Sequence, residues 1–100
     1  LNSDSSVKQL KGENRPINDE YARARLLASL QFVDAVVVFS DETPAQLIET
    51  LLPDVLVKGN DYKISEIAGG EAVLANGGEV KTVSLVDGFS TTGTIQKILA

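Results

Sequence analysis

The sequence predicts an α/β fold with a parallel sheet. Residues 33–39 form a run that is apolar and rich in β-branched residues except for Asp34, as expected of a strand buried on both faces. Residues 80–86 are a second, largely apolar run within a predicted strand over 79–86, and helix-forming segments with capping signals separate the two runs. Strands that alternate with helices of about ten residues imply right-handed crossovers, and therefore parallel strands in an open sheet.

Composition limits the classes of function. The chain has 100 residues, which favours one domain, and 43% of them are hydrophobic, which is enough for a core. A net charge of −5 argues against nucleic acid or an anionic membrane as the main partner. With no Cys and no His, the chain has no disulfide framework, no thiolate metal site and no histidine base. No apolar run approaches the roughly 18 residues of a membrane span, and we expect a cytoplasmic protein.

Two helices are predicted in the first third of the chain. The first covers residues 4–10, with Ser3 or Asp4 as its cap. The second begins after Asn18 as the cap and runs to about residue 31. Its candidate core residues are Tyr21, Leu26, Leu27 and Leu30. Arg23 and Arg25 on the same helix are expected to be surface or subunit-interface charges.

The remaining elements follow the strand at 33–39. Thr43 as cap, Pro44 at the first position and Gln46 in a capping box predict a helix start, and Pro53 ends that helix. We then expect a strand over 54–57, a loop over 58–62, a helix over about 66–76 ending at a glycine pair, and a strand over 79–86. A final helix follows, with an apolar stripe of Ile95, Ile98 and Leu99.

The segment 87–94 is the strongest candidate for a binding site. A glycine turn leads into three hydroxyl residues at the start of the last helix: Ser90, Thr91 and Thr92. The first N–H groups of a helix have no internal acceptor and lie at the positive end of its dipole, so this arrangement suits phosphate. The alternative is a simple helix cap, because Ser and Thr are favoured there for stability alone.

Charge and topology support a ligand site of this kind. Ligands of open α/β sheets bind beyond the carboxyl ends of the strands, which here lead into residues 40–41, 58–62 and 87–92. Residues 1–31 carry five basic and four acidic side chains, whereas residues 32–100 carry four basic and ten acidic ones. Side-chain partners for an anionic ligand therefore lie mainly in the first third of the chain.

Three segments together resemble one family. They are residues 2–12 (NSDSSVKQLKG) followed by Arg15-Pro16, residues 57–62 (VKGNDY), and residues 88–92 (GFSTT) with Ile95. In this order the chain resembles the cytidylyltransferase-like nucleotidyltransferase superfamily. It is most similar to the adenylyltransferase domains that make ADP-heptose, for lipopolysaccharide core biosynthesis, from heptose 1-phosphate.

The resemblance implies a Rossmann-like sheet of strand order 3-2-1-4-5. It identifies residues 1–100 as the C-terminal two-thirds of a single nucleotidyltransferase domain that begins here near the end of the second strand. The first strand and the family's HxGH motif are then expected before Leu1, and the sequence itself contains no His. Such a segment would leave strand edges unpaired and be nearly inactive alone.

The resemblance also implies roles for individual residues. The nucleotide-binding residues are Lys58, Gly59, Asp61, Ser90, Thr91 and Thr92. Lys8 and Lys11 are expected to act in catalysis by holding the attacking phosphate, on one helix face if the first helix reaches that far. Asn2, Asp4 and Arg15 are expected to bind the sugar phosphate, although Asn2 and Asp4 also suit a helix cap and Arg15 a solvated surface.

The implied reaction is attack by a sugar-phosphate oxygen on the α-phosphorus of ATP, with Mg²⁺ bridging the phosphates and pyrophosphate leaving. The implied assembly is a homodimer. Two alternatives stay open: a cytidylyltransferase that uses CTP and a polyol or amino-alcohol phosphate, and a non-catalytic nucleotide-binding or scaffold domain, which the missing His would suit.

Overall fold

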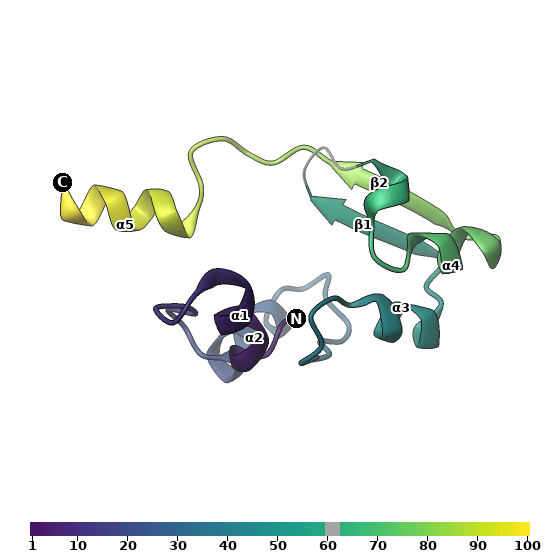
Figure 1. Ribbon diagram of the computed structural model, residues 1–100, viewed down its shortest axis with the longest axis horizontal. Helices are drawn as coiled ribbons and strands as arrows, with labels where there is room; N and C mark the ends of the chain where they lie inside the picture. The colour runs from purple at the N-terminus through teal and green to yellow at the C-terminus, as the bar shows by residue number, and fades with distance from the viewer. Residues whose placement is uncertain (60–62) are drawn as a thin grey trace. The chain divides into compact units, whose positions relative to one another are not determined.

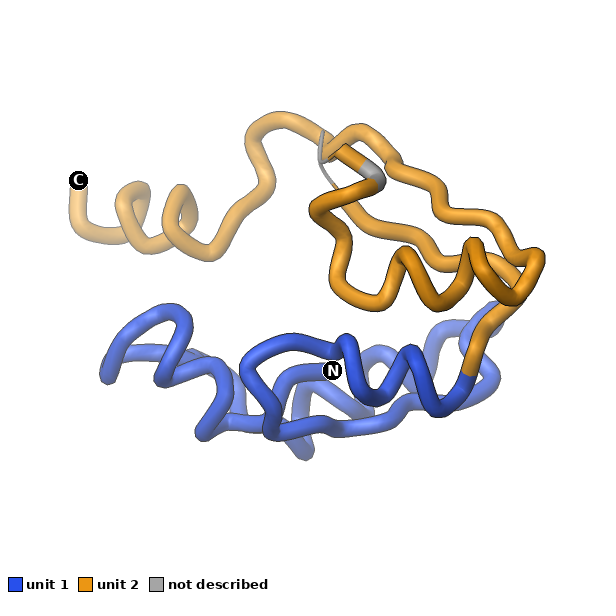
Figure 2. Tube along the Cα trace, turned by 45° about the vertical axis from the view of Figure 1, so that its right-hand side comes forward, with its two compact units in different colours: residues 1–51 blue, residues 52–100 orange. Residues whose placement is uncertain are grey.

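A computed structural model describes residues 1–59 and 63–100 and divides the chain into two compact units (Figure 2). The first unit comprises residues 1–51 and the second residues 52–100. The predicted nucleotide-binding residue Asp61 lies outside the described residues. The observed elements are mixed helix and strand, which confirms the α/β class (Figure 1).

The first unit contains three helices, each beginning near a predicted cap. Helix α1 is Asp4–Lys11, and the Ser3 hydroxyl accepts a hydrogen bond from the Ser6 amide. Helix α2 is Glu20–Ala28, and its cap is Asp19, which accepts from the Ala22 amide at 2.7 Å. The prediction of Asn18 as this cap was wrong by one residue, because Asp19 supplies the carboxylate that reaches the first turn. Helix α3 is Ala45–Leu51.

The predicted strand over residues 33–39 was wrong in extent. Only Phe39 is paired, in an isolated parallel bridge to Asn2. The Phe39 amide donates to Leu1 O at 2.9 Å, and the Ser3 amide donates to Phe39 O at 2.8 Å. A strand needs a partner of its own length, and within the first unit only the three residues at the chain start lie beside this segment.

The predicted core of α2 was also wrong. The four candidates are exposed by 67%, 69%, 39% and 41%: Tyr21, Leu26, Leu27 and Leu30. Among residues 1–51, the only buried side chains are Ser3 and Ser6. The buried centre of the first unit therefore consists of hydrogen-bonded polar side chains rather than packed apolar ones.

The second unit contains the parallel strands. β1 is Val55–Gly59 and β2 is Glu79–Val83, paired in parallel from Val55 with Glu79 to Gly59 with Val83. The prediction of parallel pairing is confirmed, although β2 ends three residues earlier than the apolar run. Among the side chains of this unit that the structure describes, the buried apolar ones are Ile67, Val73 and Val80.

The helix predicted over 66–76 is divided. A 3₁₀ turn covers Ile64–Glu66, and helix α4 covers Gly70–Ala75. Gly69 between them has a φ of +80°, a left-handed conformation that interrupts a right-handed helix. The predicted glycine ending is confirmed, since Gly77 has a φ of +82°.

Helix α5, Thr91–Leu99, follows β2 after an irregular segment (Figure 1). Its predicted stripe is only partly covered, because Ile98 and Leu99 are 75% and 80% exposed. No helix among residues 1–59 and 63–100 has the length and apolar character needed to cross a bilayer.

Candidate functional site

The start of α5 has the geometry of a capped helix. Ser90 is in an extended conformation, and its Oγ accepts a hydrogen bond from the Gly93 amide at 2.9 Å. The Thr94 hydroxyl donates to Ser90 O at 3.0 Å. The capping interpretation is thus confirmed for Ser90. It is compatible with phosphate binding, because a serine oxygen that accepts from a backbone amide still carries a proton to donate.

Two glycines give this helix start its shape. Gly88 has a φ of +87°, where a side chain is strained, so it turns the chain before the cap. A Cβ at Gly93 would lie 2.9 Å from Ser90 Oγ, so the cap hydrogen bond depends on the missing side chain there. Ser90, Thr91 and Thr92 are all exposed to solvent. The structure therefore presents the three predicted hydroxyl residues together at an accessible helix N-terminus.

The predicted residues Lys58 and Gly59 form the carboxyl end of β1. Gly59 pairs with Val83, the last residue of β2, so the two strand ends lie side by side. A Cβ at Gly59 would approach Leu85 Cδ2 to 3.0 Å, which makes glycine the residue that lets the segment after β2 pass closely. The chain then runs from the end of β2, beside Gly59, through residues 84–90 to the start of α5.

The first unit contains the predicted sugar-phosphate residues. Lys8 and Lys11 are in the last turn of α1, so the helix does reach far enough to place both on adjacent positions of one face. Both are exposed. Asn2 Nδ2 donates to Ser6 Oγ at 2.9 Å, and the Ser6 hydroxyl donates to Asp41 O at 3.2 Å. Arg15 is half-buried.

Arg23 is a residue whose position the sequence did not predict. Its side chain is only 21% exposed, and Nη2 contacts Asp4 Oδ1 at 2.9 Å. Nη1 donates to Asn2 O at 2.9 Å, and Nε donates to Asn18 O at 3.0 Å. Arg23 is therefore less exposed than a free surface charge, and its three hydrogen bonds lie within the first unit. The spacing of residues along a helix could not predict the contact between Arg23 and Asp4, because the two lie 19 residues apart along the chain.

Arg25 does lie at the surface, as expected. Its Nη1 donates to the Tyr21 hydroxyl at 2.9 Å, within the exposed face of α2.

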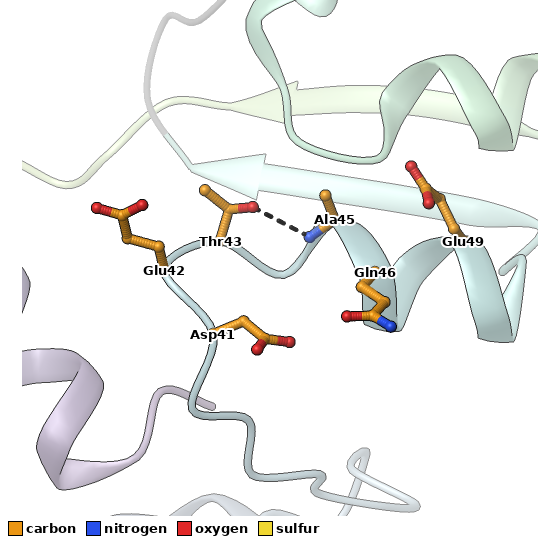
Figure 3. Close-up of a pocket in the computed structure, with 6 residues that line it drawn as sticks. All are labelled: Asp41, Glu42, Thr43, Ala45, Gln46 and Glu49. Atoms are coloured by element: carbon orange, nitrogen blue, oxygen red, sulfur yellow. Dashed lines mark hydrogen bonds between the residues drawn. The ribbon is translucent and has the colours of Figure 1, made fainter.

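A pocket in the first unit is formed by the start of α3 and the residues before it (Figure 3). Its lining residues are Asp41, Glu42, Thr43, Ala45, Gln46 and Glu49. At the edge of this pocket, the Thr43 hydroxyl accepts a hydrogen bond from the Ala45 amide at 3.4 Å (Figure 3). Three carboxylates repel phosphate, and no predicted site residue lines this pocket, so it does not fit the expected anionic ligands.

Within residues 1–59 and 63–100, no three His, Cys, Asp or Glu side chains come together as metal ligands would. The described residues therefore form no cage for Mg²⁺. The features predicted to bind anions are a hydroxyl-rich helix start in the second unit and a pair of lysines in the first. The structure thus defines a mixed α/β protein with a parallel strand pair and an exposed helix start of the kind that suits phosphate.

No protein-family model matches the chain. Among curated proteins, it is 58% identical over 100 residues to "Bifunctional protein HldE" of Mesorhizobium japonicum, and 57% identical over 98 residues to the protein of that name in Rhodospirillum rubrum. The protein of the same name from Actinobacillus pleuropneumoniae is 57% identical over 100 residues. These matches cover 98–100% of this chain.

The chain is therefore homologous along its length to a segment of the HldE proteins, which confirms the relationship predicted from the three motifs. It spans about one fifth of the length of the curated relatives it matches.

Proposed function

We propose that the protein containing this chain is a nucleotidyltransferase that transfers AMP from ATP to a sugar phosphate such as heptose 1-phosphate. The observation that carries the proposal is the Ser90-capped helix that follows a parallel strand pair, within a segment 58% identical to an HldE protein. The exposed hydroxyl groups of Ser90, Thr91 and Thr92 suit the β- and γ-phosphates of the nucleotide.

The proposed sugar-phosphate residues are those of the first unit. Lys8 and Lys11, together with Arg15, balance the charge of the attacking phosphate, and Asn2 and Asp4 contact the sugar hydroxyls. On the nucleotide side, Lys58, Gly59 and Asp61 contact the base and ribose. Of these eight residues the structure describes all but Asp61.

In the proposed reaction, an oxygen of the sugar phosphate attacks the α-phosphorus of ATP. A new P–O bond forms as the bond to the β-phosphate oxygen breaks, and pyrophosphate leaves with that electron pair. Catalysis consists of positioning and charge stabilisation, without a covalent intermediate on the protein. Mg²⁺ enters the proposed reaction as part of the ATP substrate, where it bridges the phosphates.

We also propose that residues 1–100 are the C-terminal two-thirds of one Rossmann-like domain of strand order 3-2-1-4-5. Val55 and Val57 of β1 are 48% and 55% exposed, although strands of parallel sheets are normally covered on both faces. In this proposal the first strand of the domain pairs beside β1, and other parts of the domain cover the exposed faces of the sheet. Assembly as a homodimer is part of the same proposal.

The test is an assay of the intact polypeptide that contains this chain. Purified protein is incubated with ATP and heptose 1-phosphate, and both pyrophosphate and nucleotide sugar are quantified. Equal amounts of the two products support the proposal. Turnover only with CTP and a polyol phosphate favours the cytidylyltransferase alternative, and nucleotide binding without any product favours a binding domain.

Replacing Lys8 and Lys11 by alanine should lower kcat/KM for the sugar phosphate by about tenfold each, because each removes a charged partner of the phosphate. Steady-state kinetics at saturating ATP measure the effect. Lys97→Ala, at the far end of α5, is the matched control and should change kcat/KM by less than about twofold. Equal losses in all three variants would contradict the assignment of the two lysines.

A further inference from the structure

We infer that Arg23 is a positioning residue of the sugar-phosphate site, which it serves by fixing the Asn2–Asp4 segment at the start of α1. The inference rests on the proposed function. It extends that function to a residue on a different helix, which the three sequence motifs do not include.

Arg23 bonds to three residues of the first unit, each through a different nitrogen of its side chain. Nε bonds to Asn18 O before α2, Nη1 bonds to Asn2 O, and Nη2 bonds to the Asp4 carboxylate. A guanidinium holds its donors in a fixed plane, so these contacts set both the distance and the orientation of the segment. A lysine ammonium has the charge but lacks the fork, and cannot reproduce the arrangement.

A second contact from α2 supports the same segment. Glu20 Oε1 accepts a hydrogen bond from the Asp4 amide at 3.2 Å. Asp4 is therefore held by α2 at its backbone and at its side chain. Only Oδ1 of its carboxylate contacts Arg23, and the Asp4 side chain is 32% exposed, so the carboxylate still reaches solvent and can meet a sugar hydroxyl.

The charge of Arg23 also affects how Asp4 and Lys8 can pair. Asp4 and Lys8 are four residues apart on α1, a spacing at which acidic and basic side chains pair on a helix surface. Arg23 pairs with Asp4 instead. The Lys8 ammonium then faces less competition from Asp4 when a phosphate binds. Loss of Arg23 should therefore weaken the site in two ways: a displaced Asn2–Asp4 segment and an Asp4 carboxylate that competes for Lys8.

The experiment uses the intact polypeptide with ATP and heptose 1-phosphate, and measures KM for each substrate, kcat and the melting temperature. Arg23→Ala should raise KM for the sugar phosphate about tenfold, as expected for a lost charge-assisted contact, with KM for ATP within about twofold. Arg23→Lys, which keeps the charge, should fold normally and raise the same KM severalfold. Arg25→Ala is the matched control, since Arg25 contacts only α2 among the interactions described, and should leave both constants unchanged.

Three results would overturn the inference. Arg23 variants that melt at lower temperature but keep the wild-type KM for the sugar phosphate would make Arg23 a structural contact only. A parallel rise of both KM values would do the same. If Arg23→Ala does not fold, a wild-type KM in Arg23→Lys decides against the inference. A wild-type protein that forms no nucleotide sugar overturns the proposed function itself, and does so before any variant is made.

Discussion

Replacing Ser90 by aspartate is expected to weaken ATP binding by about 100-fold while leaving α5 folded. Asp is as good an N-cap as Ser, so its carboxylate can accept the Gly93 amide that Ser90 Oγ accepts at 2.9 Å. The same carboxylate removes the hydroxyl donor and places a negative charge where the phosphates are proposed to bind. Titration calorimetry with Mg²⁺–ATP measures the affinity, and circular dichroism measures the helix content.

Two further substitutions at this position separate capping from binding. Ser90→Thr keeps the hydroxyl and the cap, so its affinity for ATP should stay within about threefold of the wild type. Ser90→Ala loses both the hydroxyl group and the cap. It should lower helix stability by about 1 kcal/mol, and it should also weaken ATP binding. A Ser90→Asp variant that binds ATP as tightly as the wild type does would exclude the start of α5 as the phosphate site.

Replacing Gly78 by alanine should destabilise the second unit by about 3 kcal/mol. A Cβ there would lie 2.8 Å from Asp54 O, 2.8 Å from Val73 Cγ1 and 3.1 Å from Pro53 O. Asp54 O and Pro53 O are backbone atoms, so a change of side-chain rotamer cannot relieve these two contacts. Relief of the clash must also disturb the Glu79 amide, which donates to Asp54 O at 2.8 Å and begins the pairing of β2 with β1.

Thermal melting of the intact polypeptide measures this loss of stability. Gly77→Asn is the matched control, because nothing lies within 4 Å of a Cβ at Gly77 and Asn tolerates its left-handed φ of +82°. The control should change stability by less than about 1 kcal/mol. Similar losses in both variants would mean that backbone conformation, not the close approach to Asp54, explains the requirement for glycine.

Local signals predicted the elements well. Ser3, Ser90 and the glycine ending of α4 are recognisable from short patterns because capping depends on a few neighbouring residues. The parallel pairing of β1 and β2 followed from their separation by a helix. These predictions needed no knowledge of distant contacts.

Predictions that depended on distant partners were less successful. An apolar run such as residues 33–39 forms a strand only where another strand lies beside it, and in the first unit that partner is three residues long. The leucines of α2 have the composition of a core, but burial is decided by what packs against them. The three acceptors of Arg23 were not predicted for the same reason, because the folded first unit brings them together.

Of the candidate site, the sequence predicted the accessible hydroxyl cluster at α5 and the lysines in the last turn of α1. Both are local features of one helix. The roles of these residues in binding and catalysis are predictions. Capping and periodicity predict where a side chain lies on a helix, but not which ligand it contacts.

The pairing of the chain start with Phe39 has a consequence for folding. The hydrogen bonds of Leu1 O and of the Ser3 amide with Phe39 join positions about 36 residues apart. Closing a loop of that length costs about 3 kcal/mol of chain entropy before any contact is gained. Helices α1 and α2 form from local contacts, whereas this bridge must wait for both ends of the loop to meet. Amide hydrogens of Ser3 and Phe39 should therefore become protected from exchange later than those within the two helices.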